Sequence, residues 1–181
     1  MGIPTFIQSN SSDTTDIASI SFTSSLDSTY DHYMFVCTDI NPATDGTEFG
    51  FQCSIDGGSN YNVSMGSIFF DAYHNEADDG AALGYQAAND LQNATTIQFL
   101  SRNTGNGADE SCAGILHLYR PSSTTYFKHF QGEFHSYGNS NFSLHQFMGG
   151  TFYDSDDDIN AIQFKMSSGN LDGLVQMYGI A

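Results

Sequence analysis

The stretch EFGFQCSI, residues 48–55, carries an apolar side chain at every second position, with small or polar residues between. Successive side chains of a β-strand point to opposite faces, so this period of two predicts a strand with one face in a core. The Asp56-Gly57-Gly58 that follows is typical of a tight turn. Residues 48–55 are therefore the clearest strand in the chain.

The same period recurs along most of the sequence. We expect further strands at residues 17–23, 31–38, 63–73, 95–100, 112–119, 125–134, 142–152, 159–166 and 174–180. Turn dipeptides such as Asp-Gly and Asn-Gly separate these runs, and only residues 81–93 favour a short helix as a competing structure. About ten strands at this spacing predict an all-β fold, a jelly-roll-like antiparallel β-sandwich that spans residues 1–181 as one domain.

The composition supports this interpretation. Ser, Thr, Asn and Gln make up 58 of the 181 residues, and there are 18 Gly. Such residues disfavour long helices, because their side chains compete for backbone hydrogen bonds and glycine costs entropy. Hydrophobic residues reach 39%, with 14% aromatic, which is enough for a core.

The charge balance excludes several functions. The chain has 21 Asp and Glu against 4 Lys and Arg, a formal charge of −17. Two lysines and two arginines cannot form the basic surface that nucleic acid or anionic lipid requires, so we expect neither as a partner. No stretch is apolar enough to span a membrane, and residues 1–5 lack the features of a secretory signal.

Candidate metal and catalytic residues are weak. The acidic run at residues 154–158 fails the EF-hand spacing and is interpreted as a solvated turn. The six histidines form no HxH or HExxH motif, although His117 and His129 lie in neighbouring predicted strands and are candidates to pair across a sheet. Symmetric assembly is a further way to gather three copies of one His or Asp. No serine lies in a Gly-x-Ser-x-Gly motif, so we predict no enzyme, no catalytic residue, no cofactor and no metal.

Cysteines and tyrosines give two further expectations. Cys37, Cys53 and Cys112 fall in apolar strands and are expected as buried free thiols, with one bridge between Cys37 and Cys53 as the alternative. Five tyrosines at predicted strand ends are candidates for a subunit interface or, second, a glycan groove. They are Tyr61, Tyr73, Tyr85, Tyr137 and Tyr153.

The C-terminal stretch AIQFKMSSGNLDGLVQMYGI, residues 161–180, is similar to a recurrent ending of tailed-bacteriophage structural proteins of marine type. In those proteins the pattern is roughly "I…F…SSGN…G…LYGI". Two further stretches, DGGSNY at residues 56–61 and residues 33–41, also match. The resemblance implies a β-sandwich virion component and transfers no catalytic residue.

Two functions follow from that resemblance. We expect a capsid decoration (cement) protein, made in the host cytoplasm, that binds the major capsid protein or other virion proteins as a homo-oligomer, in particular a trimer. The alternative is the receptor-binding domain of a tail fibre or spike that recognises a host surface glycan. The chain shows no heptad, collagen-like or short repeat that would form a fibre shaft, which favours decoration.

The N-terminal segment is the candidate interface. Residues 1–16 open with an apolar group, Ile3, Phe6 and Ile7, and continue in Ser, Thr, Asn and Asp, which is typical of an arm that reaches onto a neighbour. With four cations against 21 acids, subunit contacts cannot depend on salt-bridge networks and should be apolar and hydrogen-bonded. A basic capsid face remains a suitable docking partner, and that component of binding should weaken as salt rises.

Overall fold

The computed structural model describes residues 2–154 and 156–181, without the side chains of residues 13–15. These residues form twelve strands: β1 (Thr5–Ile17), β2 (Ile20–Phe22), β3 (His32–Pro42), β4 (Thr47–Ser54), β5 (Met65–Asn75), β6 (Ala81–Tyr85), β7 (Gln98–Thr104), β8 (Cys112–Tyr119), β9 (Lys128–Gly138), β10 (Phe142–Phe152), β11 (Ala161–Met166) and β12 (Leu171–Ile180). The all-β prediction is confirmed. Within the described residues there is no helix that is long and apolar enough to cross a bilayer.

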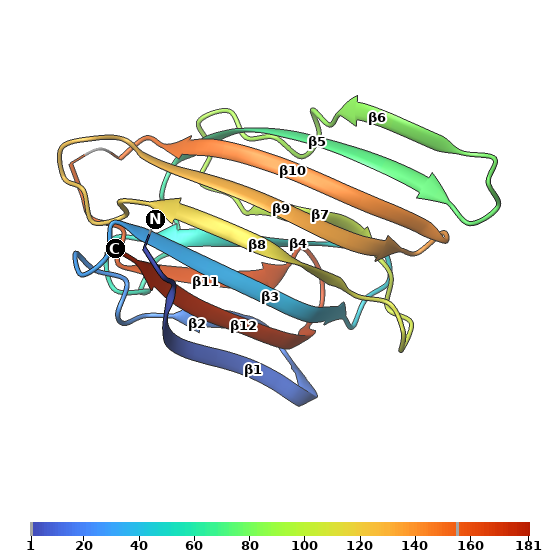
Figure 1. The fold of residues 1–181 in the computed structure, drawn as a ribbon, viewed down its shortest axis with the longest axis horizontal. Coiled ribbons are helices and arrows are strands. Elements are labelled where there is room, and N and C mark those ends of the chain that lie inside the picture. The colour runs from blue at the N-terminus through green and yellow to red at the C-terminus, as the bar shows by residue number, and fades with distance from the viewer. Residues whose placement is uncertain (1, 155) are drawn as a thin grey trace.

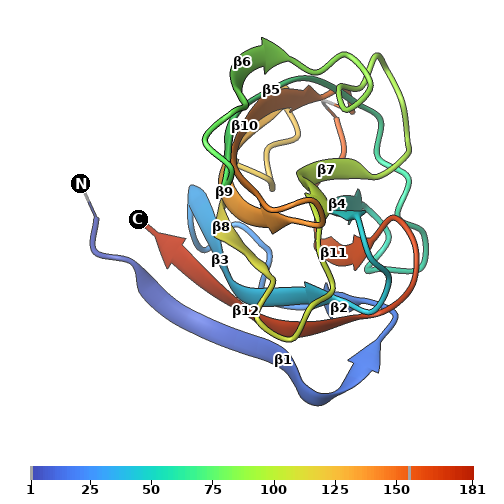
Figure 2. The same cartoon turned by 90° about the vertical axis from the view of Figure 1, so that its right-hand side faces the viewer.

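All strand pairs are antiparallel, and together they form one nearly closed sheet (Figures 1 and 2). One run has the order β1-β12-β3-β8-β9-β10-β5-β6, and a second has the order β7-β4-β11-β2. The two runs join at a single residue pair between β7 and β9, Thr104 opposite Gly138. At the other side, the side chain of Asn10 on β1 donates to the carbonyl of Ser21 on β2, at 2.7 Å.

The core lies between the two runs and is rich in phenylalanine. Phe49, Phe51 and Cys53, the apolar positions of the stretch at residues 48–55, are fully buried on β4. Phe51 meets Phe130 of β9 edge to face, with ring centroids 5.2 Å apart. Phe49 stacks on Phe164 of β11 at 5.9 Å. Edge-to-face and offset contacts of this kind add to the free energy of burial, so the alternation on β4 positions both runs.

The structure corrects three sequence expectations. There are twelve strands instead of about ten, because the polar residues 5–17 pair with β12 and residues 81–85 pair with β5. Residues 81–93 therefore begin as strand β6 and form no helix. Cys37 and Cys53 are not cross-strand neighbours, since β3 pairs with β12 and β8, whereas β4 pairs with β7 and β11. All three cysteines are buried and free.

Candidate functional site: the outer face of the long run

All six histidines of the chain project from one surface, the solvent side of the β1–β6 run, which we call the outer face. Side chains alternate along each strand, and directly opposite residues of paired strands share a face. His135 lies opposite His145 and Ala113, and Tyr119 lies opposite both His32 and His129. The same pairing places His74, opposite Ser143, and His117, opposite Met34, on the outer face as well. The histidines are His32 (β3), His74 (β5), His117 (β8), His129 and His135 (β9), and His145 (β10).

The first histidine pair joins β3 and β8. Nε2 of His32 lies 2.7 Å from Nδ1 of His117, and the His32 ring stacks on Tyr119 at 4.8 Å. Burial lowers the pKa of both imidazoles, and the neighbouring His117 lowers that of His32 further. One ring of the pair donates and the other accepts, so at least one of the two imidazoles is neutral in this contact. The sequence expectation that His117 pairs with His129 is wrong, because His117 lies opposite Gln131.

The second pair is part of a chain of four polar side chains. His135 contacts the hydroxyl of Ser143 through Nε2 at 3.0 Å and Nδ1 of His145 at 3.2 Å. Nε2 of His145 in turn lies 2.9 Å from the Glu133 carboxylate. Burial and the adjacent His145 lower the pKa of His135. The connectivity is that of a hydroxyl, two imidazoles and an acid.

The surroundings of Ser143 differ from those of a typical serine nucleophile. A serine nucleophile needs backbone N–H donors aimed at the developing oxyanion. Ser143 instead lies in the regular strand β10. It is opposite His74 of β5 on one side and opposite Tyr137 of β9 on the other. Across the described part of the chain, no three His, Cys, Asp or Glu side chains are arranged to hold a metal ion. The arrangement is therefore a hydrogen-bonded row of one hydroxyl, two imidazoles and one carboxylate on the outer face.

A shallow groove of about 440 Å³ crosses the outer face over β8 and β9. His117, Glu133, His135 and His145 border it, and Ala113 and Ile115 form part of its lining. The small side chain of Ala113 lies opposite the bulky His135, which leaves room at this point. The groove thus combines imidazole groups with an apolar floor.

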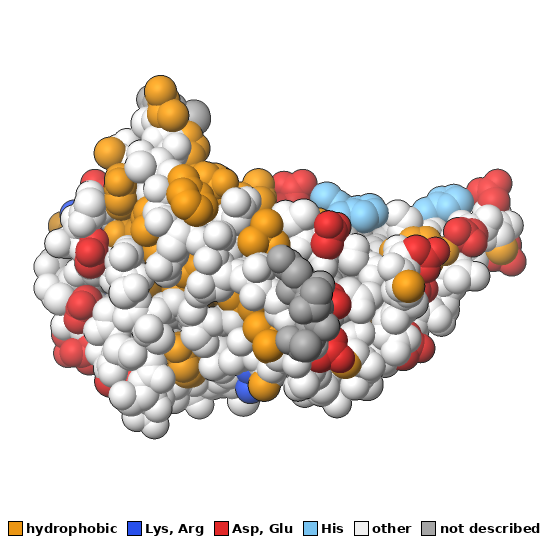
Figure 3. Space-filling view, turned by 90° about the horizontal axis from the view of Figure 1, so that it is seen from below, with side chains coloured by type: hydrophobic (Ala, Val, Ile, Leu, Met, Phe, Trp, Pro, Cys, Tyr) orange, Lys and Arg blue, Asp and Glu red, His pale blue; other side chains and the backbone are white. Residues whose placement is uncertain are grey.

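Carboxylates are scarce on the outer face, although the chain has 21 Asp and Glu. Glu133 is the only one in the middle of the face among the described residues. Asp39 and Asp172 lie at one end, where Asp109 and Glu110 join them around a hollow of about 650 Å³. Figure 3 shows histidines along the upper edge and hydrophobic side chains gathered at the upper left. The middle of the outer face thus carries little negative charge, whereas carboxylates lie towards its ends, including Asp78, which is 3.2 Å from His74.

The candidate interface residues of the N-terminal segment lie in different environments. Ile3 is 87% exposed, and Phe6 is 52% exposed and meets Tyr178 of β12 edge to face at 5.6 Å. Phe6 and Tyr178 are opposite each other on the outer face. A bulge follows Phe6, and Ile7 packs against the core instead. Residues 5–17 form β1, so most of the predicted arm is an edge strand of the sheet.

The acidic run and the five tyrosines, the other candidate binding residues of the sequence, lie in separate places. Asp156, Asp157 and Asp158 are exposed in a turn, where the Asp157 carbonyl accepts from the ammonium of buried Lys128. The five tyrosines share no single groove. Tyr73 lines a cavity between β5 and β7, for example, whereas Tyr153 contacts Phe127.

The sequence contained a signal for the outer face that motif searches missed. His129 and Glu133 are an even number of residues apart in the predicted strand at residues 125–134, and so point to the same side; His135 continues this alternation one residue beyond that strand. His117 and Tyr119 are likewise two residues apart in the predicted strand at residues 112–119. Parity alone assigns each group to one side of its strand, but only the strand order brings them to one surface.

Comparisons with known proteins add no relative. No protein-family model matches the chain, and neither a curated protein nor a solved structure is detectably similar to it.

Proposed function

We propose that this chain is a structural protein of a bacteriophage particle, without enzymatic activity, and that it decorates and stabilises the capsid as a homo-oligomer. The resemblance of residues 161–180 to the ending of phage structural proteins supports the class. In the structure these residues form β11, the turn at residues 167–170 and β12. β11 pairs with β4 in the short run, and β12 pairs with β3 in the long run. The motif is thus part of the structural framework, and Tyr178 within it also lies on the outer face opposite Phe6.

We further propose that the fold is a jelly roll. Two hairpins, β5–β6 and β9–β10, pair with each other and extend the long run. Without these hairpins eight strands remain, namely β1, β2, β3, β4, β7, β8, β11 and β12. When they are renumbered 1 to 8 in chain order, the long run has the order 1-8-3-6 and the short run has the order 2-7-4-5. That is the strand order of a jelly roll, an architecture common among viral shell proteins.

The single observation that carries the proposal is the charge distribution. The outer face presents imidazoles, aromatic rings and aliphatic side chains around one central carboxylate, whereas the net charge of the chain is −17. Stable association surfaces are depleted of charge in their centre and enriched in aromatic residues. The outer face would hold copies together, in particular as a trimer, and the carboxylate-rich remainder would face a basic capsid surface.

An added carboxylate on the outer face tests the oligomer. Gln131 is exposed on β9, opposite His117, and Gln131→Glu adds one charge without changing shape. Ser24→Glu adds the same charge in the exposed turn between β2 and β3 and is the control. Sedimentation velocity should show an oligomer for the parent chain and Ser24→Glu, and weaker association for Gln131→Glu. A monomeric parent chain at high concentration would contradict the oligomer.

Reconstruction of whole particles tests the location. We expect density for this chain at repeated positions on the head, each in contact with the major capsid protein. Particles that lack the chain should lose infectivity faster on heating, because the shell would lose a mechanical support. Density confined to the tail would favour a receptor-binding domain of a fibre or spike, which is the alternative function.

A further inference from the structure

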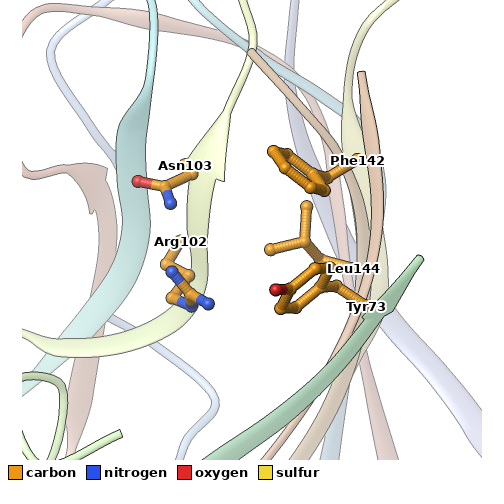
Figure 4. A pocket seen from close by; sticks show the side chains of 5 residues that line it. All are labelled: Tyr73, Arg102, Asn103, Phe142 and Leu144. Carbon is orange, nitrogen blue, oxygen red and sulfur yellow. The ribbon is translucent and has the colours of Figure 1, made fainter. Parts of the chain in front are cut away.

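A second site lies inside the split between the two runs of strands. β7 meets β9 only at Thr104, and the preceding residues of β7 diverge from β9. A cavity of about 220 Å³ opens there, lined by Tyr73, Arg102, Asn103, Phe142 and Leu144 (Figure 4). Arg102 and Asn103 form one wall on β7, and the other three form the opposite wall on β5 and β10.

The polar wall is held in position from behind. Nε of Arg102 donates to the carboxylate of Asp71, whose side chain is 1% exposed. Asp71 also accepts from Nε2 of Gln86 at 2.8 Å. In the part of the chain that the structure describes, the other two guanidinium nitrogens of Arg102 have no hydrogen-bond partner. Their N–H groups remain free to donate to a ligand, and Asp71 already balances their charge.

Asn103 adds a second set of free groups. Its backbone is left-handed, with φ of 53°, which turns the side chain out of the regular alternation of β7. Its amide makes no hydrogen bond to any described residue. The cavity therefore presents two guanidinium nitrogens of Arg102 and the side-chain amide of Asn103, none of which has a hydrogen-bond partner among the described residues.

The opposite wall is apolar and aromatic. The rings of Tyr73 and Phe142 stand nearly perpendicular, with centroids 5.1 Å apart, and Leu144 lies directly opposite Tyr73 on the paired strand. Two residues further along the same strands, and on the same side of the sheet, Asp71 lies opposite Gln146. Oε1 of Gln146 is buried and has no partner among the described residues. Gln146 does not line the cavity, so a ligand there would not contact this acceptor directly.

We propose that this cavity binds one neutral saccharide ring. The guanidinium of Arg102 and the amide of Asn103 would hydrogen-bond the ring hydroxyls, and Tyr73, Phe142 and Leu144 would cover its apolar C–H face. A binding cavity with apolar walls and a few placed polar groups is the usual form of a small-ligand site. A neutral ligand fits better than an anion, because Asp71 balances Arg102 and the chain as a whole carries −17.

This inference goes beyond capsid decoration and can be tested on the isolated chain. The probes are D-glucose, D-galactose, D-mannose and N-acetyl-D-glucosamine, with D-glucuronate as the anionic comparison, each titrated to about 50 mM against the ¹⁵N-labelled protein. We expect at least one neutral sugar to bind with a dissociation constant in the millimolar range. Its chemical-shift changes should centre on Arg102, Asn103 and Phe142.

Two variants locate the binding. Asn103→Gly keeps the left-handed backbone and removes the amide, and Arg102→Lys keeps a cation for Asp71 and removes the planar set of donors. Each should weaken binding about tenfold, as the loss of one or two hydrogen bonds implies. Asn93→Gly, at another left-handed asparagine on a loop outside the cavity lining, should leave binding unchanged.

Three results would overturn the assignment. They are an absence of shifts with every neutral sugar, binding of D-glucuronate alone, and sugar binding that survives both cavity variants. None of them bears on where the chain lies in a particle, so failure here is distinguishable from failure of the decoration proposal.

Discussion

Arg102 on β7 donates through Nε to the carboxylate of Asp71 on β5, and this contact joins the short run of strands to the hairpin that extends the long run. Asp71 is buried, and Arg102 keeps 20% of its side chain exposed. The Nε–H of the guanidinium thus binds Asp71 within the fold, whereas Arg102 also lines the cavity. The same residue serves structure and the proposed ligand site.

Arg102→Met should strongly destabilise the protein. The change leaves the Asp71 carboxylate buried with only Gln86 as a donor, and breaking a buried pair from one side costs about 3–5 kcal/mol. The free energy of unfolding can be measured by chemical denaturation. Asp71→Leu combined with Arg102→Met should recover much of the loss, because no charge is then left unpaired. Equal stability of Arg102→Met and the parent chain would show that the pair contributes nothing.

Lys128→Met should destabilise the turn that contains the acidic run. Lys128 is 1% exposed, and its ammonium donates to the carbonyls of Ser123, at 3.1 Å, and Asp157. Burial lowers the pKa of this lysine, while the nearby aspartates act in the opposite direction. Methionine fills the space but leaves the carbonyls without a donor, at a cost of about 1–3 kcal/mol.

The control for Lys128 is Lys165→Met on β11, at a less buried position. We expect a change within about 0.5 kcal/mol there. Thermal unfolding of both variants would check the difference. Two equal losses would mean that the effect reflects net charge and not the buried ammonium.

Acidification should lower the stability of the fold through the outer face. The folded-state pKa values of His32, His117 and His135 are lowered, so the unfolded chain binds protons first as the pH falls. Stability is therefore full above the unfolded pKa of about 6.5 and decreases as the pH falls below it towards the folded pKa values. Denaturation midpoints measured between about pH 7.5 and pH 5.5 should decrease steadily.

A single variant separates this effect from general acid denaturation. His117→Gln removes one titrating ring and relieves the repulsion on His32. Its midpoint should fall less steeply over the same pH range. A slope identical to that of the parent chain would exclude the histidine pair as the origin.

The three cysteines should be inert in the native protein. Burial raises the pKa of Cys112 to about 11, even though Ser101 and Thr104 oppose the shift, and it raises the pKa values of Cys37 and Cys53 as well. The thiolate is the reactive form, so an aromatic disulfide reagent at about pH 8 should label none of them quickly. All three should react in concentrated guanidinium chloride. Rapid labelling of one native thiol would mean that a strand opens readily.

Much of the fold could be predicted from the sequence because apolar alternation is local. The predicted strands at residues 112–119 and 142–152 coincide with β8 and β10. β1 was missed because its Ser-, Thr- and Asn-rich sequence carries no period. It is a strand because β12 provides hydrogen-bond partners along its length. β6 was missed because Ala81, Ala82 and Leu83 are exposed, so no buried face marks them.

The sites were less predictable because they depend on strand order. His32 and His117 are 85 residues apart, and Asp71 and Arg102 are 31 apart. Each pair meets only because two particular strands are neighbours or face each other across the split. Ile7 follows Phe6 directly and so alternates to the core side, whereas the bulge between Phe6 and Gln8 shifts the register of the later residues of β1, which no sequence period reveals.

The copy number of this chain in purified particles tests the decoration proposal most directly. Quantitative mass spectrometry against the major capsid protein gives that ratio without any assumption about structure. We predict hundreds of copies per particle, in a fixed ratio to the capsid protein. A handful of copies per particle would contradict capsid decoration and place the chain in the tail.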